Sequence, residues 1–173
     1  MYDEVLREVE GRIADNGSAG KADIGALVFW KRIQANAKWV LDLHRVSDEE
    51  VRRVTGRAVR AVRAKGAIVP ERAEAARTEL QALPGFRSRA SYSVASALLV
   101  AASPDTMAVY DKRARIGLTA LGVAFQPEYG YGAYMTLIES MRHDVNTAQG
   151  LSWTARDVDL GLFLLGGEPR AAG

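Results

Sequence analysis

The chain has 173 residues, of which 48% are hydrophobic and 25% are charged, a composition typical of one globular domain and not of a disordered or fibrous chain. Cysteine is absent, which excludes disulfides, thiol catalysis and cysteine-bound metal centres, and the two histidines are too widely separated to suggest a metal site. The 23 basic and 21 acidic residues leave a net charge of +2, so the distribution of charge is more informative than its sum. We therefore expect a single domain over residues 1–173, with no metal and no cofactor.

No apolar run approaches the roughly 18 residues that a membrane-spanning helix requires. The acidic start, Met1 to Glu4, is not followed by the apolar core of a signal peptide. These features predict a cytoplasmic protein that does not enter a membrane, and they give no indication of its oligomeric state.

Apolar residues recur at helical spacing along most of the chain, whereas alternating strand patterns are scarce. Ser47 with Glu50 forms a capping-box pattern, and Thr154 with Asp157 resembles a second helix start. The pattern predicts an all-α, compact helical domain of about seven or eight helices. In chain order, the expected helices span residues 5–13, 24–33, 47–65, 70–82, 88–102, 104–122, 133–145 and 154–165.

The expected helix at 47–65 carries a segregated charge pattern. Its arginines fall within an arc of about 140° around the helix axis, opposite an apolar face of valine and alanine. Acidic residues oppose them only in the first turn, so we expect little neutralisation within the helix. Such a face can follow a line of phosphates, although most charged faces are simply solvated. These arginines, called the basic stripe below, are Arg52, Arg53, Arg57, Arg60 and Arg63, of which Arg53, Arg57 and Arg60 are the candidate DNA contacts.

A proline–glycine turn between two expected helices is a second candidate phosphate site. Such a turn at Pro84-Gly85 can present backbone amides outward, and the start of the next helix adds the positive end of its dipole. Arg87, Ser88 and Arg89 place two cations and a hydroxyl beside Gly85. The alternative interpretation is an ordinary connection between two helices.

The order of segments around this turn resembles the helix–hairpin–helix DNA glycosylases, the superfamily of endonuclease III and the 8-oxoguanine glycosylases. The resemblance rests on Leu83-Pro84-Gly85 as the hairpin, on the small apolar helix that follows, and on Met107 to Asp111 after a proline. It covers roughly residues 20–166, with the helix–hairpin–helix region at about 70–115. The resemblance implies a glycosylase-like helical fold, double-stranded DNA as the partner and Asp111 as the catalytic aspartate.

Two positions depart from the family pattern. The family hairpin usually has a second glycine where this chain has Arg87, and members with lyase activity have a nucleophilic lysine where counting from Gly85 reaches Arg89. Arginine stays protonated and cannot form a Schiff base, and residues 66–111 contain no lysine. The resemblance therefore implies a monofunctional enzyme, in which Asp111 stabilises the sugar cation as the base leaves or orients a water.

Asp111 also has a structural interpretation, an ion pair with Arg115 four residues later inside the expected helix. The catalytic interpretation requires that the Asp111 carboxylate and the Pro84-Gly85 turn face one groove rimmed by arginines. If packed aliphatic side chains fill the space between them, the chain is a plain helical bundle.

A glycosylase needs a pocket with aromatic faces for the extruded base. Trp30, Tyr92 and Tyr110 are the candidates, because Trp30 is followed by two cations and Tyr110 precedes the candidate aspartate. Phe29 lies at helical spacing among apolar residues, and we expect it in the core.

Three functions remain open from the sequence. The first is a divergent glycosylase that hydrolyses the N-glycosidic bond of a modified or damaged base with Asp111, a DNA-repair enzyme located at the nucleoid. The second is a non-catalytic helix–hairpin–helix module that binds DNA, and the third is a helical domain whose basic stripe docks an acidic protein. Base release, salt-sensitive duplex binding and failure to bind nucleic acid distinguish the three.

Overall fold

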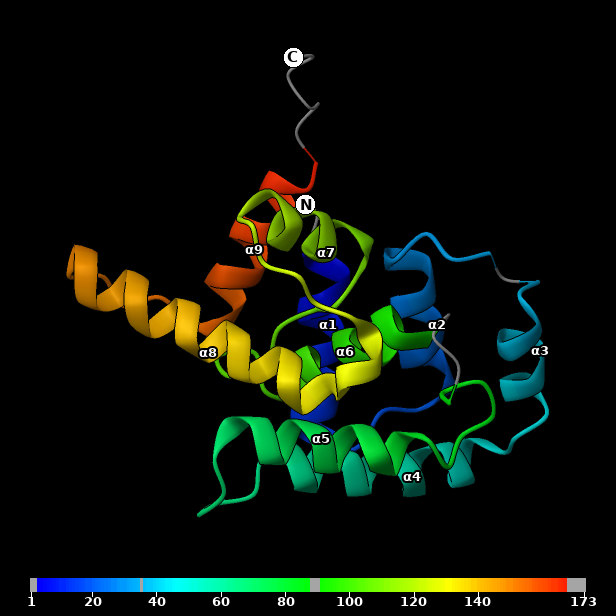
Figure 1. The fold of residues 1–173 in the computed structure, drawn as a ribbon. Coiled ribbons are helices and arrows are strands. Elements are labelled where there is room, and N and C mark those ends of the chain that lie inside the picture. The colour runs from blue at the N-terminus through cyan, green and yellow to red at the C-terminus, as the bar shows by residue number, and fades with distance from the viewer. Residues whose placement is uncertain (1–2, 35, 88–90, 168–173) are drawn as a thin grey trace.

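Helix α6 (Tyr92–Ala102) lies at the centre of the fold. Its residues from Val94 onward are buried, because nearly all of them are small and apolar. Four helices contact it (Figure 1): α1 (Glu4–Asn16), α2 (Lys21–Trp30), α4 (Asp48–Val62) and α5 (Val69–Leu80). The computed structural model describes residues 3–34, 36–87 and 91–167. Within these ranges the regular structure is entirely helical, which confirms the predicted class.

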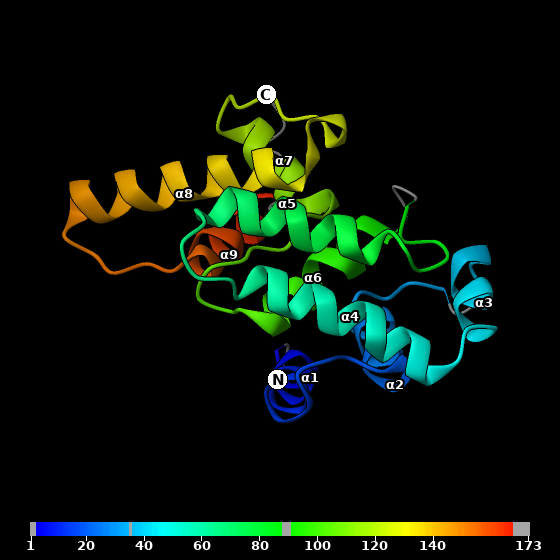
Figure 2. The same cartoon turned by 90° about the horizontal axis from the view of Figure 1, so that it is seen from below.

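The described residues also form four further helices and a short 3-10 turn: α3 (Lys38–His44), α7 (Lys112–Ala120), η2 (Pro127–Tyr129), α8 (Gly130–Gln149) and α9 (Ala155–Leu165). Helices α4 and α5 lie side by side, with α8 packed on α5 (Figure 1, Figure 2). A Cβ at Gly132 of α8 would lie only 2.8 Å from the Pro70 carbonyl oxygen, so glycine permits this contact. Helices α7 and α9 also pack closely at a glycine. A Cβ at Gly117 would overlap the Leu162 carbonyl, so glycine permits this contact as well.

The prediction of one helix over residues 104–122 is wrong. The chain turns after Ser103, runs as a buried non-helical segment over 107–110, and starts α7 at Lys112. Side chains of other helices supply several of the backbone hydrogen bonds that a helix would have made in this buried segment. The bonds run from Tyr131 Oη to Ala108 O (2.7 Å), from Tyr134 Oη to Val109 O (3.0 Å) and from Tyr110 N to Ser96 Oγ (3.0 Å).

The other helices differ from the predictions mainly at their ends. The segment expected at 24–33 is α2, which begins and ends three residues earlier. The periodicity missed α3, whose seven residues are too few to show a helical repeat. The helix expected at 133–145 extends further in both directions as α8. Residues 88–90, at the start of the helix expected at 88–102, lie outside the described residues.

Both predicted helix starts are confirmed. The Ser47 hydroxyl accepts from the Glu50 amide and the Thr154 hydroxyl accepts from the Asp157 amide, each at 3.2 Å. The core prediction for Phe29 is wrong, because its side chain is 77% exposed. Local capping patterns were thus more reliable than the inward or outward orientation of a single aromatic residue.

Candidate functional site

Asp111 stands at the N-terminus of α7 and not inside a helix. Its backbone is extended, with φ −141° and ψ −175°, and its Oδ1 accepts from the Ala114 amide at 2.9 Å. This is an N-cap, which short polar side chains favour because the first helical amides have no partner within the helix. Its other oxygen, Oδ2, forms an ion pair with Nζ of Lys31, which follows α2. The expected helix-interior position, with Arg115 as the ionic partner, is therefore wrong.

Lys31 is the ionic partner of Asp111 that the sequence analysis missed. The side chains of Lys31 and Asp111 are 8% and 14% exposed, so the ion pair is largely shielded from water. The ammonium nitrogen also lies 5.0 Å from the ring centroid of Trp30, a cation–π distance. Eighty residues separate Lys31 from Asp111, so no spacing rule could join them. The available signal was the pair of cations after Trp30.

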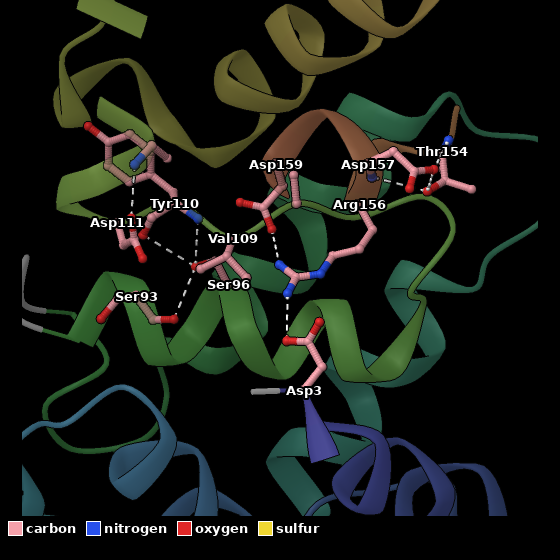
Figure 3. Close-up of polar contacts among 12 residues, drawn as sticks. Asp3, Ser93, Ser96, Val109, Tyr110, Asp111, Thr154, Arg156, Asp157 and Asp159 are labelled. Atoms are coloured by element: carbon pink, nitrogen blue, oxygen red, sulfur yellow. Dashed lines mark hydrogen bonds and ion pairs between the residues drawn. The ribbon is translucent and has the colours of Figure 1, made fainter. Parts of the chain in front are cut away.

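Asp111 and Lys31 line a hollow of about 290 Å³, called the Asp111 cavity below. Residues from the end of α2, from α6, from the start of α7 and from α9 meet there, and Figure 3 shows Ser93 of α6 near Asp111. The volume is at the lower end of the range for ligand sites. The lining residues are Trp30, Lys31, Arg32, Ser93, Asp111, Lys112, Arg113 and Phe163, which include four cations and one carboxylate.

Close backbone packing holds Arg113 at this cavity. Its guanidinium carbon lies 4.5 Å from the ring centroid of Phe163. Gly166, which follows α9, approaches the backbone of Arg113 so closely that a Cβ there would overlap the carbonyl oxygen. A Cβ at Gly167 would lie 3.3 Å from Nη1 of Arg113. The two glycines that the sequence marks only as a helix end therefore provide the space for this arginine.

Arg32 has a left-handed backbone conformation, with φ 53°, and is the one non-glycine residue with positive φ in the described ranges. It lies where α2 ends: Arg32 N donates to Phe29 O at 2.9 Å, and Ile33 N donates to Val28 O at 3.0 Å. Glycine or asparagine usually occupies this position, because a larger side chain strains the left-handed backbone. The Arg32 side chain is exposed and lines the Asp111 cavity.

A buried ion-pair network adjoins the cavity wall. Arg156 of α9 pairs with the buried Asp159 and donates to Asp3 at 2.9 Å (Figure 3). Its guanidinium carbon lies 6.0 Å from the ring centroid of Trp30. Burial raises the pKa of Asp159 to about 6 despite the attraction of Arg156, and the charge of Asp111 adds to the rise. The network therefore contains a carboxyl group that titrates near neutral pH.

Of the three aromatic residues predicted for a base pocket, Trp30 lines the Asp111 cavity and the other two belong to a cluster of rings. The ring of Tyr110 is buried and lies edge-on against three others, Tyr92 at 5.6 Å, Phe125 at 5.5 Å and Tyr134 at 4.9 Å. Edge-to-face contacts at these distances are typical of a packed interior. Tyr92 and Tyr110 therefore pack in a cluster of rings and do not line the Asp111 cavity.

The described part of the proline–glycine turn lies against α3. Gly85 has φ 80° and packs on Trp39 of α3 so tightly that a Cβ would overlap the Trp39 Cβ. Glycine is therefore required at this position for two reasons, its backbone conformation and the lack of space. Arg87 is exposed, and its Nε donates to a carbonyl of the same connection at 3.0 Å. Ser88 and Arg89, two of the predicted DNA contacts, lie outside the described residues.

This turn opens on a second hollow of about 610 Å³, called the Gly85 cavity below, which Gly85 lines together with α3 and the connection before it. Ile33 lines the Gly85 cavity while Arg32 lines the Asp111 cavity, so consecutive residues border the two hollows. The described turn residues, 83–87, do not line the Asp111 cavity. Instead of one shared groove, the structure has two adjacent hollows divided by the connection between α2 and α3.

The basic stripe of α4 is partly neutralised: within the helix only Arg52 and Arg53 are paired, each with a first-turn carboxylate, and the third ion pair uses a carboxylate of α5. Three of its arginines form ion pairs and a fourth donates to a backbone carbonyl, while Arg60 has no ion pair within the described ranges. The contacts are Arg52 with Asp48 (2.7 Å), Arg53 with Glu50 (2.5 Å), Arg57 with Glu79 (2.6 Å) and Arg63 with the Ala102 carbonyl (2.8 Å). The carboxylate of Glu79 comes from α5, which reading one helix at a time could not show.

Among the described residues, no group of three or more histidines and carboxylates is placed to bind a metal ion, and no helix is long and apolar enough to cross a membrane. Comparisons with protein-family models, with curated proteins and with solved structures found no match to this chain. The chemistry of the Asp111 cavity is therefore the basis for assigning a function.

Proposed function

We propose that this protein is a monofunctional, glycosylase-like enzyme that hydrolyses the N-glycosidic bond of a modified or damaged base in double-stranded DNA, with Asp111 as the catalytic carboxylate. The observation that carries the proposal is the Asp111 carboxylate at a cavity whose other charged lining residues are cations. Such a site suits a substrate that develops positive charge at one atom and carries negative phosphates beside it.

In the proposed reaction the Asp111 carboxylate faces the sugar from which the base departs. As the C1′–N bond breaks, its electron pair leaves with the base, and the carboxylate stabilises the positive charge that develops on the sugar. A water oxygen then forms the new bond to C1′, and a proton of this water passes to the departing base. Lys31 and the Ala114 amide hold one carboxylate oxygen each, so the group is oriented before the substrate arrives.

We propose that a duplex spans the two adjacent hollows, in place of the single groove that the sequence led us to expect, because a free nucleoside would occupy only one of them. A strand laid over the connection between α2 and α3 would reach the Asp111 cavity beside Arg32 and the Gly85 cavity beside Ile33. Trp30 offers an aromatic face for an extruded base in the first cavity. In this arrangement the Gly85 turn contacts phosphates one hollow away from the reacting sugar.

Base release from duplexes that carry deaminated, oxidised or alkylated bases tests the proposal. We expect the wild-type chain to release at least one class of base, and Asp111→Asn to lose about 100-fold or more in rate while keeping its duplex affinity. Asparagine preserves the size and the N-cap role of the side chain, and an unfolding curve checks the fold. Asp105→Asn, in an exposed turn, is the matched control and should keep the full rate. A wild-type rate in Asp111→Asn, or no release from any duplex, rejects the proposal.

One observation favours a second function, a DNA-binding module without chemistry. Both carboxylate oxygens of Asp111 already have partners, as in a purely structural cap. This alternative predicts salt-sensitive duplex binding by both the wild type and Asp111→Asn, with base release by neither. Binding to an acidic protein with no affinity for DNA at low salt would instead favour a helical interaction domain.

A further inference from the structure

Three cations of the Asp111 cavity have no carboxylate partner among the described residues. Lys31 is paired with Asp111, which leaves Arg32, Lys112 and Arg113 around the same hollow. Like charges gathered at a concave surface repel one another, and the low-dielectric walls focus the potential that attracts an anion. By residue type, the cavity therefore carries an excess of three positive charges.

Arg113 is positioned before any ligand arrives. Its guanidinium is stacked on Phe163, an arrangement that leaves the in-plane N–H donors available for the paired oxygens of an oxyanion. The close approach of Gly166 to its backbone fixes the start of α7 against the end of α9. Little conformational freedom is then lost when an anion binds.

Arg32 occupies a position at which arginine is unfavourable for the fold. Its backbone is left-handed, and glycine would adopt this conformation without strain. The side chain is exposed and has no ion pair within the described part of the chain, so packing does not account for an arginine there. Strained residues of this kind are concentrated at ligand sites.

The first turn of α7 borders the same hollow through Lys112 and Arg113. Lys112 and Arg113 are its first two residues, and amides at these positions have no acceptor within the helix. Ser93 of α6, a residue with a hydroxyl group, also lines the hollow. The residues that line this hollow carry guanidinium, ammonium and hydroxyl donors, which proteins use to bind tetrahedral oxyanions.

We infer that the Asp111 cavity is a phosphate-binding site, in which Arg32, Lys112 and Arg113 hold a phosphate group beside the Lys31–Asp111 pair. The DNA backbone, a mononucleotide and a sugar phosphate share this chemistry. Where the phosphate belongs to DNA, the inference rests on the proposed function and places the phosphate next to the reacting sugar. The phosphate site itself requires no base excision.

Binding of inorganic phosphate to the full chain tests the site, with chloride at equal ionic strength as the reference. We expect phosphate to raise the Tm of the wild type. Arg32→Gln removes the charge and keeps the backbone strain, so it should weaken phosphate binding about tenfold with an unchanged Tm in chloride. Arg32→Gly removes both charge and strain, so it should weaken binding equally and raise the Tm in chloride. Arg53→Gln on α4 is the matched control and should bind phosphate as the wild type does.

Deoxyribose 5-phosphate, a mononucleotide and an undamaged duplex, used as competitors, separate the sources of the phosphate. If the duplex competes with inorganic phosphate for the wild-type site, and if this competition is lost in Arg32→Gln, the site is assigned to DNA. Competition by the small phosphates without duplex binding supports the phosphate site and rejects the proposed glycosylase function. The inference is overturned if phosphate leaves the Tm unchanged, if its effect survives in Arg32→Gln, or if Arg32→Gly loses stability in chloride.

Discussion

Two arginine-rich regions of the molecule use the same side chain in opposite ways. On α4 the basic stripe runs along one helix, and most of its members meet a carboxylate of the same helix or of α5. At the Asp111 cavity, cations from α7 and from the end of α2 converge on a hollow whose one carboxylate is taken by Lys31. A row of arginines in a sequence is thus compatible with solvated ion pairs, whereas convergence of cations from separate helices indicates a site.

The convergence of cations at the Asp111 cavity depends most strongly on the packing of α7 against α9, which positions Arg113. Gly117→Ala adds a Cβ that overlaps the Leu162 carbonyl, and we expect it to lower the free energy of unfolding by about 3 kcal/mol in urea denaturation. Gly161→Ala on α9 is the matched control, because its Cβ would meet only Trp153, at 4.0 Å. It should gain up to about 1 kcal/mol, since alanine favours a helix. Equal effects of the two substitutions would show that the close approach is not needed.

A buried ion pair should respond to pH differently from the exposed pairs of the stripe. Asp159 has a pKa of about 6 in the folded protein against 3.8 ordinarily, so the folded chain holds this proton more tightly than the unfolded chain. The resulting stability is fully present below about pH 4 and is lost as the pH rises through 6. Glu50 beside Arg53 has a lowered pKa, so its contribution has the opposite sign and is lost as the pH falls.

Urea unfolding of the wild type and of Asp159→Asn at pH 4 and pH 7 measures this contribution. We expect the wild type to lose about 2–3 kcal/mol relative to the variant over this range. The difference between the two proteins isolates Asp159 from the other carboxyl groups that titrate near pH 4. A difference that is independent of pH would show that burial does not dominate the titration of Asp159.

Removing cations from the cavity should weaken DNA binding more than removing them from the stripe. Lys112→Ala with Arg113→Ala should lower duplex affinity about tenfold or more and reduce the salt dependence by about two ions. Arg53→Ala with Arg57→Ala should lower it less than about threefold, because carboxylates already neutralise both side chains. Fluorescence anisotropy at several salt concentrations measures both pairs. Equal losses of duplex affinity in the two double variants would indicate that the basic stripe of α4 belongs to the DNA interface.

The smallest expected effect concerns the ion pair between Arg57 and Glu79. Both side chains are partly exposed, so a double-mutant cycle with alanine should give a coupling of about 0.5 kcal/mol that decreases with added salt. Thermal or urea unfolding of the four proteins measures it. A coupling above about 2 kcal/mol would mean that the stripe stabilises the fold and is more than a solvated face.

The amino-acid sequence by itself determined the helical class and several helix starts. Periodic apolar residues and the caps at Ser47 and Thr154 act over one or two turns, so they can be read without knowing the partners of each helix. The same local rules wrongly predicted Asp111 inside a helix, because the spacing of apolar residues around 107–110 is compatible with a helix. Nothing local indicates that tyrosines of α8 and Ser96 of α6 supply the hydrogen bonds of that segment.

Only the tertiary structure decided which charges meet. Lys31 pairs with Asp111 across eighty positions of the chain, and Glu79 of α5 pairs with Arg57. One candidate site therefore gained a lysine, and the other has one unpaired arginine fewer than its own helix indicates. The glycines after α9 determine where Arg113 lies, although the sequence marks them only as a helix end. The physical reason is that an ion pair or a close backbone contact depends on distance in space, whereas helix propensity and capping depend on distance along the chain.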